Sequence, residues 1–282
     1  MAAAVAFGCM EKPVKRHITG VEHISCEGYS LFYITDLSDE LKAVIRNCLA
    51  SVCHGAAKAS TGRPMYCYKT TLSEFIRRYR VKNPSTQKGM IGELLLHILM
   101  SEFLDEYQIN SPFFNLEERS IKKGFDVVLN KKGTLDIWLA EVKSGEPTAG
   151  KNSSQTAVSL INKAKNDLDE RLNGESLSLW MNAVNGAQHA IDNARDDKDA
   201  IIAILENHGD SASVDAIKST DINAILVGTV FANLADPIDS DAIQEKRSHI
   251  MKEKKFKDIL LVAIQKETYD AVYAFLESES RQ

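Results

Sequence analysis

Residues 124–145 read GFDVVLNKKGTLDIWLAEVKSG and decide the fold that this sequence predicts. The stretch holds two runs, 126–131 and 134–143, that contain valine, isoleucine and tryptophan residues typical of strands. Lys132 and Gly133 lie between the two runs, where the glycine indicates a turn. The sequence therefore predicts a β-hairpin.

The second strand of this hairpin ends in charged residues. Because alternate residues of a strand share a face, Glu141 and Lys143 project to the same side. The residues behind them on that side are apolar, namely Leu135, Ile137 and Leu139. A carboxylate and an ammonium group that follow an apolar face must emerge at the edge of a core or be paired.

The register of the hairpin decides whether a third charged residue joins them. A turn centred on residues 132–133 sets Asp126 opposite Leu139, on the same face as Glu141 and about 7 Å from it along the strand. A shift of one residue would move Asp126 to the opposite face. Two carboxylates at this spacing can converge on one small cation, whose oxygen ligands lie at about 2.0–2.1 Å.

The flanking sequence alternates between helices and strands. A helix is predicted over 84–105, because Pro84 marks a helix start and apolar residues follow at spacings of three and four. A second long helix is predicted from Ser153 or Ser154. The other expected elements are strands at 29–34, 225–231 and 258–264, and helices at 38–53, 71–79, 197–206, from Asp239 and from Thr268. This order predicts an α/β sandwich with a mixed sheet.

Asp126, Glu141 and Lys143 are the residue types that phosphodiester hydrolysis needs. A cation holds the non-bridging oxygens and activates water, and Asp and Glu oxygens favour Mg²⁺ or Mn²⁺ over softer metals. A lysine beside the attacking water orients it and favours its deprotonated form. The competing interpretation is a solvent-facing Glu–Lys pair, which is common on strands and contributes little. Glu93 lies within the apolar run of the 84–105 helix, although a surface pair with His97 would also explain it.

Taken in order, Glu93, Asp126, Glu141 and Lys143 resemble the motif of the PD-(D/E)xK, or restriction-endonuclease-like, nuclease superfamily. Gly-Phe-Asp stands here where the superfamily name has Pro-Asp. More narrowly, the segment KGMIGELLLH at 88–97 and the hairpin segments resemble the HamA family. Its members are the nuclease subunits of the Hachiman anti-phage defence system. The similarity extends over most of the chain, while the specific motifs occupy about 88–165.

This resemblance implies a fold and a metal site. The expected fold is a restriction-endonuclease-like core, a central mixed sheet flanked by helices, with an N-terminal α+β extension. Residues 1–82 would form that extension and a candidate partner interface, and 83–282 the nuclease domain with a C-terminal α/β tail. The catalytic residues would be Asp126, Glu141 and Lys143. The ligands of Mg²⁺, or alternatively Mn²⁺, would be Glu93, Asp126, Glu141 and the backbone carbonyl of Val142.

The resemblance also implies partners, and the charge of the chain fits them. A superfamily 2 ATP-dependent helicase, HamB-like, would hold the nuclease in check and activate it on DNA. The net charge of −5 lacks the basic excess of proteins that grip nucleic acid by themselves, so the partner would supply DNA affinity. Basic residues gather at 63–88 and 246–257, where solvated faces are the alternative. The chain has no G-x-x-x-x-G-K-[ST] loop, so it should not hydrolyse ATP.

Two further residues could support the site. Gln155, at the start of the helix after the hairpin, would orient groups in the site, or be an exposed amide of the first turn. Lys163 would contact phosphates, or belong to a solvated face. Two other functions stay open at this point: a catalytically inactive binding or regulatory subunit, and a nuclease that acts on RNA.

Composition indicates a cytoplasmic protein without a membrane segment. No apolar run approaches the ~20 residues that span a bilayer, and residues 2–7 are too short for a secretion signal. The five cysteines are an odd number without a C-x-x-C pair, so we expect buried free thiols rather than disulfides or a zinc site.

Overall fold

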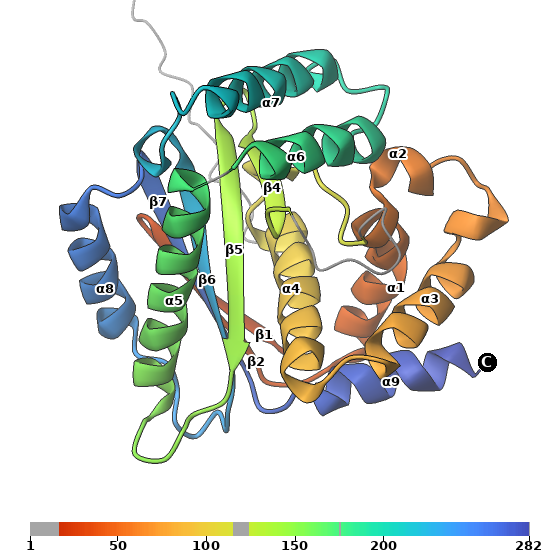
Figure 1. Cartoon of the computed structure of the whole chain (residues 1–282). Coiled ribbons are helices and arrows are strands. Elements are labelled where there is room, and N and C mark those ends of the chain that lie inside the picture. The colour runs from red at the N-terminus through yellow and green to blue at the C-terminus, as the bar shows by residue number, and fades with distance from the viewer. Residues whose placement is uncertain (1–16, 115–123, 175, 282) are drawn as a thin grey trace, which may run out of the picture.

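The computed structural model describes residues 17–114, 124–174 and 176–281. At its centre lies a seven-stranded sheet with the order β1-β2-β7-β6-β5-β4-β3 (Figure 1). Its strands are β1 (Val21–Cys26), β2 (Tyr29–Ile34), β3 (Tyr107–Ile109), β4 (Val127–Lys131), β5 (Ile137–Gly145), β6 (Asn223–Phe231) and β7 (Asp258–Lys266). The β1–β2, β3–β4 and β4–β5 pairs are antiparallel, and the others are parallel. The predicted mixed sheet is confirmed.

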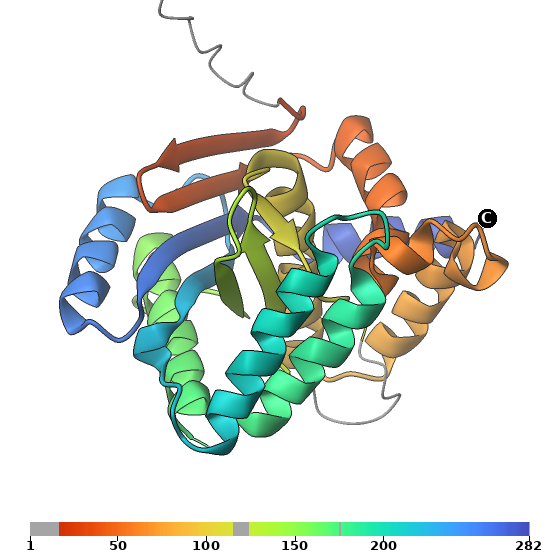
Figure 2. The same cartoon turned by 90° about the horizontal axis from the view of Figure 1, so that it is seen from above.

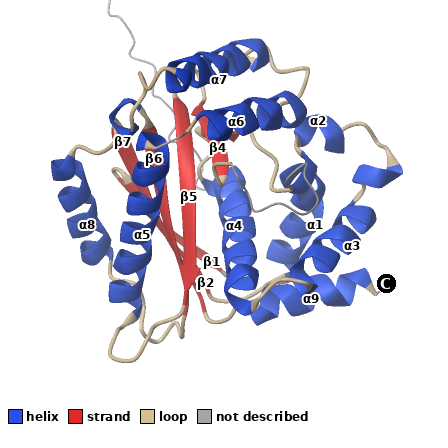
Figure 3. Ribbon diagram, in the orientation of Figure 1, coloured by secondary structure: helices blue, strands red, loops and turns tan. Residues whose placement is uncertain are grey.

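Helices cover both faces of this sheet (Figure 3). One layer contains α1 (Asp39–His54), α3 (Tyr68–Arg80), α4 (Pro84–Phe103) and α9 (Asp270–Ser280). The other contains α5 (Ser153–Asn173), α6 (Leu177–Ala190), α7 (Lys198–Ser213) and α8 (Ser240–Glu253). In Figure 1, β5 runs between α5 on one side and α4 on the other. The α/β fold class is thus confirmed.

The helix starts follow the expected capping chemistry. The Ser38 hydroxyl accepts a hydrogen bond from the Leu41 amide at the start of α1. Asn83 does the same for the Thr86 amide at the start of α4, and Pro84 occupies the first turn. These caps explain why the predicted helix starts near 38 and 84 are correct to within a residue.

The N-terminal region has the expected α+β content and is built into the main sheet. β2 pairs in parallel with β7, so the β1–β2 hairpin forms one edge of the sheet (Figure 2). The helices α1 and α3 pack against α4. The short segments α2 (Ala56–Ala59) and η1 (Pro64–Tyr66) lie in the connection from α1 to α3. No break in the sheet marks the expected boundary between 82 and 83 among the residues described.

The described cysteines and helices bear on the disulfide and membrane predictions. Cys26, Cys48, Cys53 and Cys67 form no disulfide with one another; of these four, only Cys53 is buried, and Cys67 is exposed. Cys9 and residues 2–7 lie outside the described residues. Within the described ranges, no helix has both the length and the apolar character needed to cross a bilayer.

Candidate active site

The β4–β5 hairpin places Asp126 level with Glu141. The observed pairs are Val127 with Ala140 and Val128 with Leu139, so the residue before β4 is opposite Glu141. This register differs by two residues from the expected pairing of Asp126 with Leu139. The loop is wider than a two-residue turn, because β4 ends at Lys131 and β5 begins only at Ile137. A shift of two residues keeps the face, so Asp126 still joins Glu141.

The wider loop also changes the position of Leu135. This residue was expected behind Glu141 on the apolar face, but it precedes β5 and is 47% exposed. Ile137 and Leu139 do lie on that face and are buried in the layer that contains α5. The apolar part of the face is therefore two residues long before the charged part begins.

The carboxylate of Asp126 binds the edge of β5, just before β4 begins. Its Oδ2 accepts a hydrogen bond of 2.8 Å from the backbone amide of Val142. The N–H and C=O of a strand residue leave the strand on the same edge. The Val142 carbonyl is therefore directed to the edge at which Asp126 lies.

Glu141 is the most buried member of the site, with 2% of its surface exposed. Its Oε1 accepts from Lys143 Nζ at 2.9 Å, and its Oε2 accepts from Arg171 Nη1 at 2.8 Å. Burial and the nearby charge of Asp126 raise the pKa of Glu141, while Arg171 and Lys143 oppose that rise. A buried carboxylate beside a second carboxylate is thus stabilised by two cations.

Lys143 bridges two carboxylates. Its ammonium lies 2.9 Å from Glu141 Oε1 and 2.8 Å from Asp167 Oδ2. Burial alone would lower the pKa of Lys143, but the carboxylates of Glu141 and Asp167 outweigh it and the net pKa is raised. Lys143 therefore remains a cation at neutral pH.

Helix α5 supplies two site residues that the sequence did not reveal, Asp167 and Arg171. Arg171 also donates to the carbonyl of Gly124 and lies over the Phe125 ring, 5.9 Å from its centroid. The two residues are four apart, so they share one face of a helix. That spacing is visible in the sequence, but nothing there shows which helix face meets β5.

A family model described as HamA matches residues 11–279 of the 282. The chain belongs to the HamA family. It is therefore a component of a Hachiman defence system, as the sequence predicted. No curated protein sequence matches the chain significantly.

Glu93 lies on α4, in the layer that covers the opposite face of the sheet from Glu141. It is half-buried, and its charge acts on Cys53 of α1. Burial is the main cause that raises the pKa of the Cys53 thiol, Arg78 opposes the rise and Glu93 adds to it. No three acidic, histidine or cysteine side chains of the described residues are grouped closely enough to hold an ion. The role of Glu93 as a third ligand stays a prediction.

The structure does not bring Gln155 to this site. Its side chain forms a capping box with Asn152. The Oε1 of Gln155 accepts from the backbone amide of Asn152 at 3.1 Å, and the backbone amide of Gln155 donates to Asn152 Oδ1 at 2.8 Å. Gln155 precedes Asp167 by twelve residues, which is about 18 Å along a helix.

Lys163 is exposed and lies one turn before Asp167, so phosphate contact by Lys163 stays a prediction.

The basic residues of 63–88 are largely engaged in ion pairs. Arg77 and Arg78 both bind Glu74, and Arg80 binds Glu277 of α9. In the second basic stretch, Lys246 donates to Asn162. These contacts favour the solvated-face interpretation over a free DNA-binding patch.

The site fits a hard divalent cation. Asp126, Glu141 and the Val142 carbonyl offer oxygen donors at one edge of β5, which is the donor set that Mg²⁺ and Mn²⁺ prefer. Burial, followed by the charge of Asp126, raises the pKa of Glu141, and a cation between the two carboxylates would offset their repulsion. Each oxygen of Glu141 accepts one hydrogen bond, from Lys143 or from Arg171, so these two cations would compete with a metal for its charge.

Proposed function

We propose that this HamA-family chain is a Mg²⁺-dependent DNA nuclease of the PD-(D/E)xK type. The observation that carries the proposal is the convergence of Asp126, Glu141 and a charged Lys143 at one edge of β5. A solvent-facing Glu–Lys pair, the competing interpretation, would leave Glu141 in water. Glu141 is instead almost completely buried beside a second carboxylate. This arrangement costs stability and is typical of functional sites.

Each residue has a role that follows from its surroundings. Asp126, Glu141 and the Val142 carbonyl would hold the ion, which supplies Lewis-acid stabilisation of the phosphate and acidifies a bound water. Lys143 is fixed by Asp167 on its far side, so it keeps its charge and position if Glu141 turns toward the metal. It then orients the attacking water and favours loss of its proton.

Arg171 gives the site a resting state. Its guanidinium donates both to Glu141 Oε2 of β5 and to the carbonyl of Gly124, just before β4, so it places a positive charge between these two segments. In this state the carboxylate of Glu141 is neutralised by side chains of the chain itself. A nuclease whose metal ligand is engaged in this way is suited to an effector that must stay inactive until it is triggered.

The partner in this proposal is a superfamily 2 helicase of the same Hachiman system, in the cytoplasm. A net charge of −5 and paired arginines on α3 give the chain little DNA affinity of its own. The helicase would bring DNA to the nuclease and control its release. Residues 1–82, beyond the minimal core, are the candidate interface.

The test is a plasmid-degradation assay with Mg²⁺, with and without the helicase, that compares the wild-type chain with Lys143→Ala. We expect Lys143→Ala to lower the cleavage rate by about 10²–10³-fold, the range for loss of one charge-stabilising group. The matched control is Lys132→Ala, in the exposed β4–β5 turn, which should cleave at the wild-type rate.

Other outcomes identify the alternatives. Equal cleavage by wild type and Lys143→Ala would exclude Lys143 from the mechanism. Cleavage of RNA but not plasmid would identify an RNA nuclease. An absence of cleavage under every condition would favour the regulatory subunit, for which the engagement of both Glu141 oxygens by cations is the supporting observation.

A further inference from the structure

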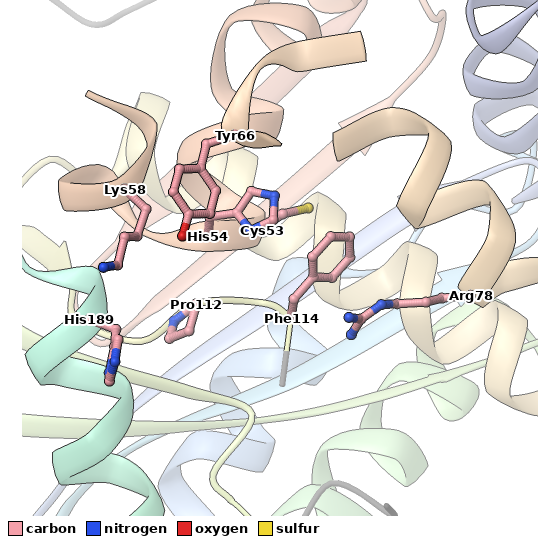
Figure 4. A pocket seen from close by; sticks show the side chains of 8 residues that line it. All are labelled: Cys53, His54, Lys58, Tyr66, Arg78, Pro112, Phe114 and His189. Carbon is pink, nitrogen blue, oxygen red and sulfur yellow. The ribbon is translucent and has the colours of Figure 1, made fainter. Parts of the chain in front are cut away.

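A second site lies away from Glu141, among helices α1, α3 and α6. A cavity of about 400 Å³ opens between the end of α1, η1, α3 and the last turn of α6. Figure 4 shows Lys58 and His189 at one side of it, Arg78 at the other, and the rings of His54, Tyr66 and Phe114 between them. Cavities that take small ligands begin at about 300 Å³, so the volume suits a ligand of that class.

The described residues that line this cavity include cations but no carboxylate. Lys58 is half-buried, and its ammonium forms no hydrogen bond or ion pair with the described residues. His189 lies on the same side of the cavity as Lys58 (Figure 4), and its Nδ1 donates to the Asn185 carbonyl at 2.7 Å. That bond leaves Nε2 for the cavity, where it can make a hydrogen bond to a ligand. Lys58 and His189 together form one end that is suited to an anion.

Arg78 builds the opposite wall. Its guanidinium binds Glu74 and lies over the Phe114 ring, 4.3 Å from its centroid. Because Glu74 neutralises part of its charge, Arg78 contributes a planar surface more than a free cation. The cavity is therefore polar in one half and lined by flat groups in the other.

The rings of the cavity are held in contact with one another. The His54 centroid lies 5.1 Å from that of Tyr66 and 5.3 Å from that of Phe114. Burial, followed by the charge of Arg78, lowers the pKa of His54, while Glu74 opposes the shift. His54 is thus a neutral ring at pH 7, which donates or accepts through Nε2 with Thr71 at 3.1 Å. An aromatic ligand would find rings already in place.

We propose that this cavity binds a nucleotide, with its phosphate between Lys58 and His189 and its base against Tyr66 and His54. A cation beside aromatic rings is the combination that binds a nucleotide, because the phosphate needs charge and the base needs a flat apolar surface. An acidic peptide would use the same cations, but it has no need of the aromatic rings. The aromatic lining of the cavity therefore favours the nucleotide.

The nucleotide has two sources, a free mononucleotide or the end of a nucleic-acid strand. Helix α6 connects the cavity to the proposed active site: Trp180 near its start packs on Phe125, and His189 at its end lines the cavity. Nine residues of helix span about 14 Å. The cavity and Phe125, which precedes Asp126 in the chain, therefore lie near the two ends of one helix.

The test measures binding to the full chain by calorimetry in metal-free buffer with EDTA, so its result does not depend on cleavage. The probes are deoxyadenosine 5′-monophosphate, inorganic phosphate, and a tetranucleotide with and without a 5′-phosphate. The variants are Lys58→Ala, His189→Gln and Tyr66→Leu, with Lys132→Ala as a control for loss of a lysine elsewhere. Each variant is first checked for an unchanged melting temperature.

We expect the mononucleotide to bind, and Lys58→Ala or His189→Gln to weaken it about tenfold. Tyr66→Leu should weaken the nucleotide several-fold and leave inorganic phosphate unchanged, and Lys132→Ala should have no effect. Tighter binding of the phosphorylated tetranucleotide than of the mononucleotide would identify a strand end, and equal binding a free nucleotide. The proposal is overturned if neither nucleotide probe binds, if inorganic phosphate binds equally well, or if Lys58→Ala changes nothing.

Discussion

Strand β5 presents different chemistry to its two neighbouring helix layers. Toward α4 it presents Trp138, Ala140 and Val142, all within one apolar core. Toward α5 it presents Ile137 and Leu139 and then, in the same alternation, Glu141 and Lys143. The two faces begin alike and differ only in the last half of the strand.

The difference lies in what each helix brings to the sheet. Helix α5 brings Asp167 and Arg171, which bind Lys143 and Glu141. Helix α4 approaches β5 so closely at Gly92 that an added Cβ would lie 1.9 Å from Ser144 Oγ. A charge can therefore be buried on the α5 face because Asp167 and Arg171 pair with it there, whereas the α4 face has little space at Gly92.

The strongest test of this comparison moves a carboxylate to the other face. In Ala140→Glu a charge is placed on the α4 side, at a residue that is 1% exposed and packed in the apolar core. We expect a loss of about 4 kcal/mol or more in the free energy of unfolding, because the new carboxylate is buried without a partner. Urea denaturation followed by circular dichroism measures it.

The control separates charge from size. Ala140→Gln adds a side chain of the same length without a charge, so its loss reports overpacking alone. If Ala140→Glu were no less stable than Ala140→Gln, the α4 face would tolerate charge and the contrast between the faces would not hold.

Much of this contrast could be predicted from the sequence, because it rests on local patterns. The alternation of Ile137, Leu139 and Glu141 gave the face of the site, and the apolar spacing in 84–105 gave the long helix. Only the parity of the hairpin register had to be correct for Asp126 to meet Glu141. The expected pairing was wrong by two residues. Asp126 still lies on the predicted face, because side chains of a strand alternate with a period of two.

The remaining parts depend on contacts between distant segments. Asp167 and Arg171 face β5 because α5 runs back along it, an arrangement set by packing rather than by local sequence. Gln155 was chosen for its position near the helix start, which is the end of α5 far from Glu141. Helix α6 was not predicted at all, although its Trp180 packs on Phe125 beside the site.

Arg171→Gln tests the partner that makes the α5 face different. It removes the hydrogen bonds to Glu141 and to the Gly124 carbonyl, so we expect a loss of about 1–3 kcal/mol without metal. With Mg²⁺ the variant should recover more melting temperature than the wild type, because Arg171 no longer competes for Glu141. Thermal melts in EDTA and in Mg²⁺ measure both effects.

A matched control is Lys42→Gln, which removes a cation paired with the fully exposed Asp39. It should change stability by less than about 0.5 kcal/mol and leave the response to Mg²⁺ unchanged. An Arg171→Gln variant that behaved like this control would show that Arg171 does not hold Glu141 in solution.

Gly92→Ala tests the close approach on the α4 face. The new methyl group would meet Ser144 Oγ at 1.9 Å and Thr229 Oγ1 at 3.2 Å. We expect a net loss of about 1 kcal/mol, since overpacking outweighs the gain in helix propensity. Adding Ser144→Ala should restore most of it, because that hydroxyl has no hydrogen-bond partner among the described residues. Losses that simply add in the double variant would argue against direct contact.

The smallest expected effect is a pH dependence that only the α5 face should show. Burial, then the charge of Asp126, raises the pKa of Glu141 above its ordinary value of 4.5. Between the unfolded and the folded pKa, the folded chain holds more protons than the unfolded chain, so rising pH lowers the stability of the wild type. Glu141→Gln has no such group at this position. Its melting temperature relative to wild type should therefore increase as the pH rises above 4.5 in metal-free buffer. A difference that stayed constant or fell with pH would mean that Arg171 and Lys143 outweigh the burial of Glu141.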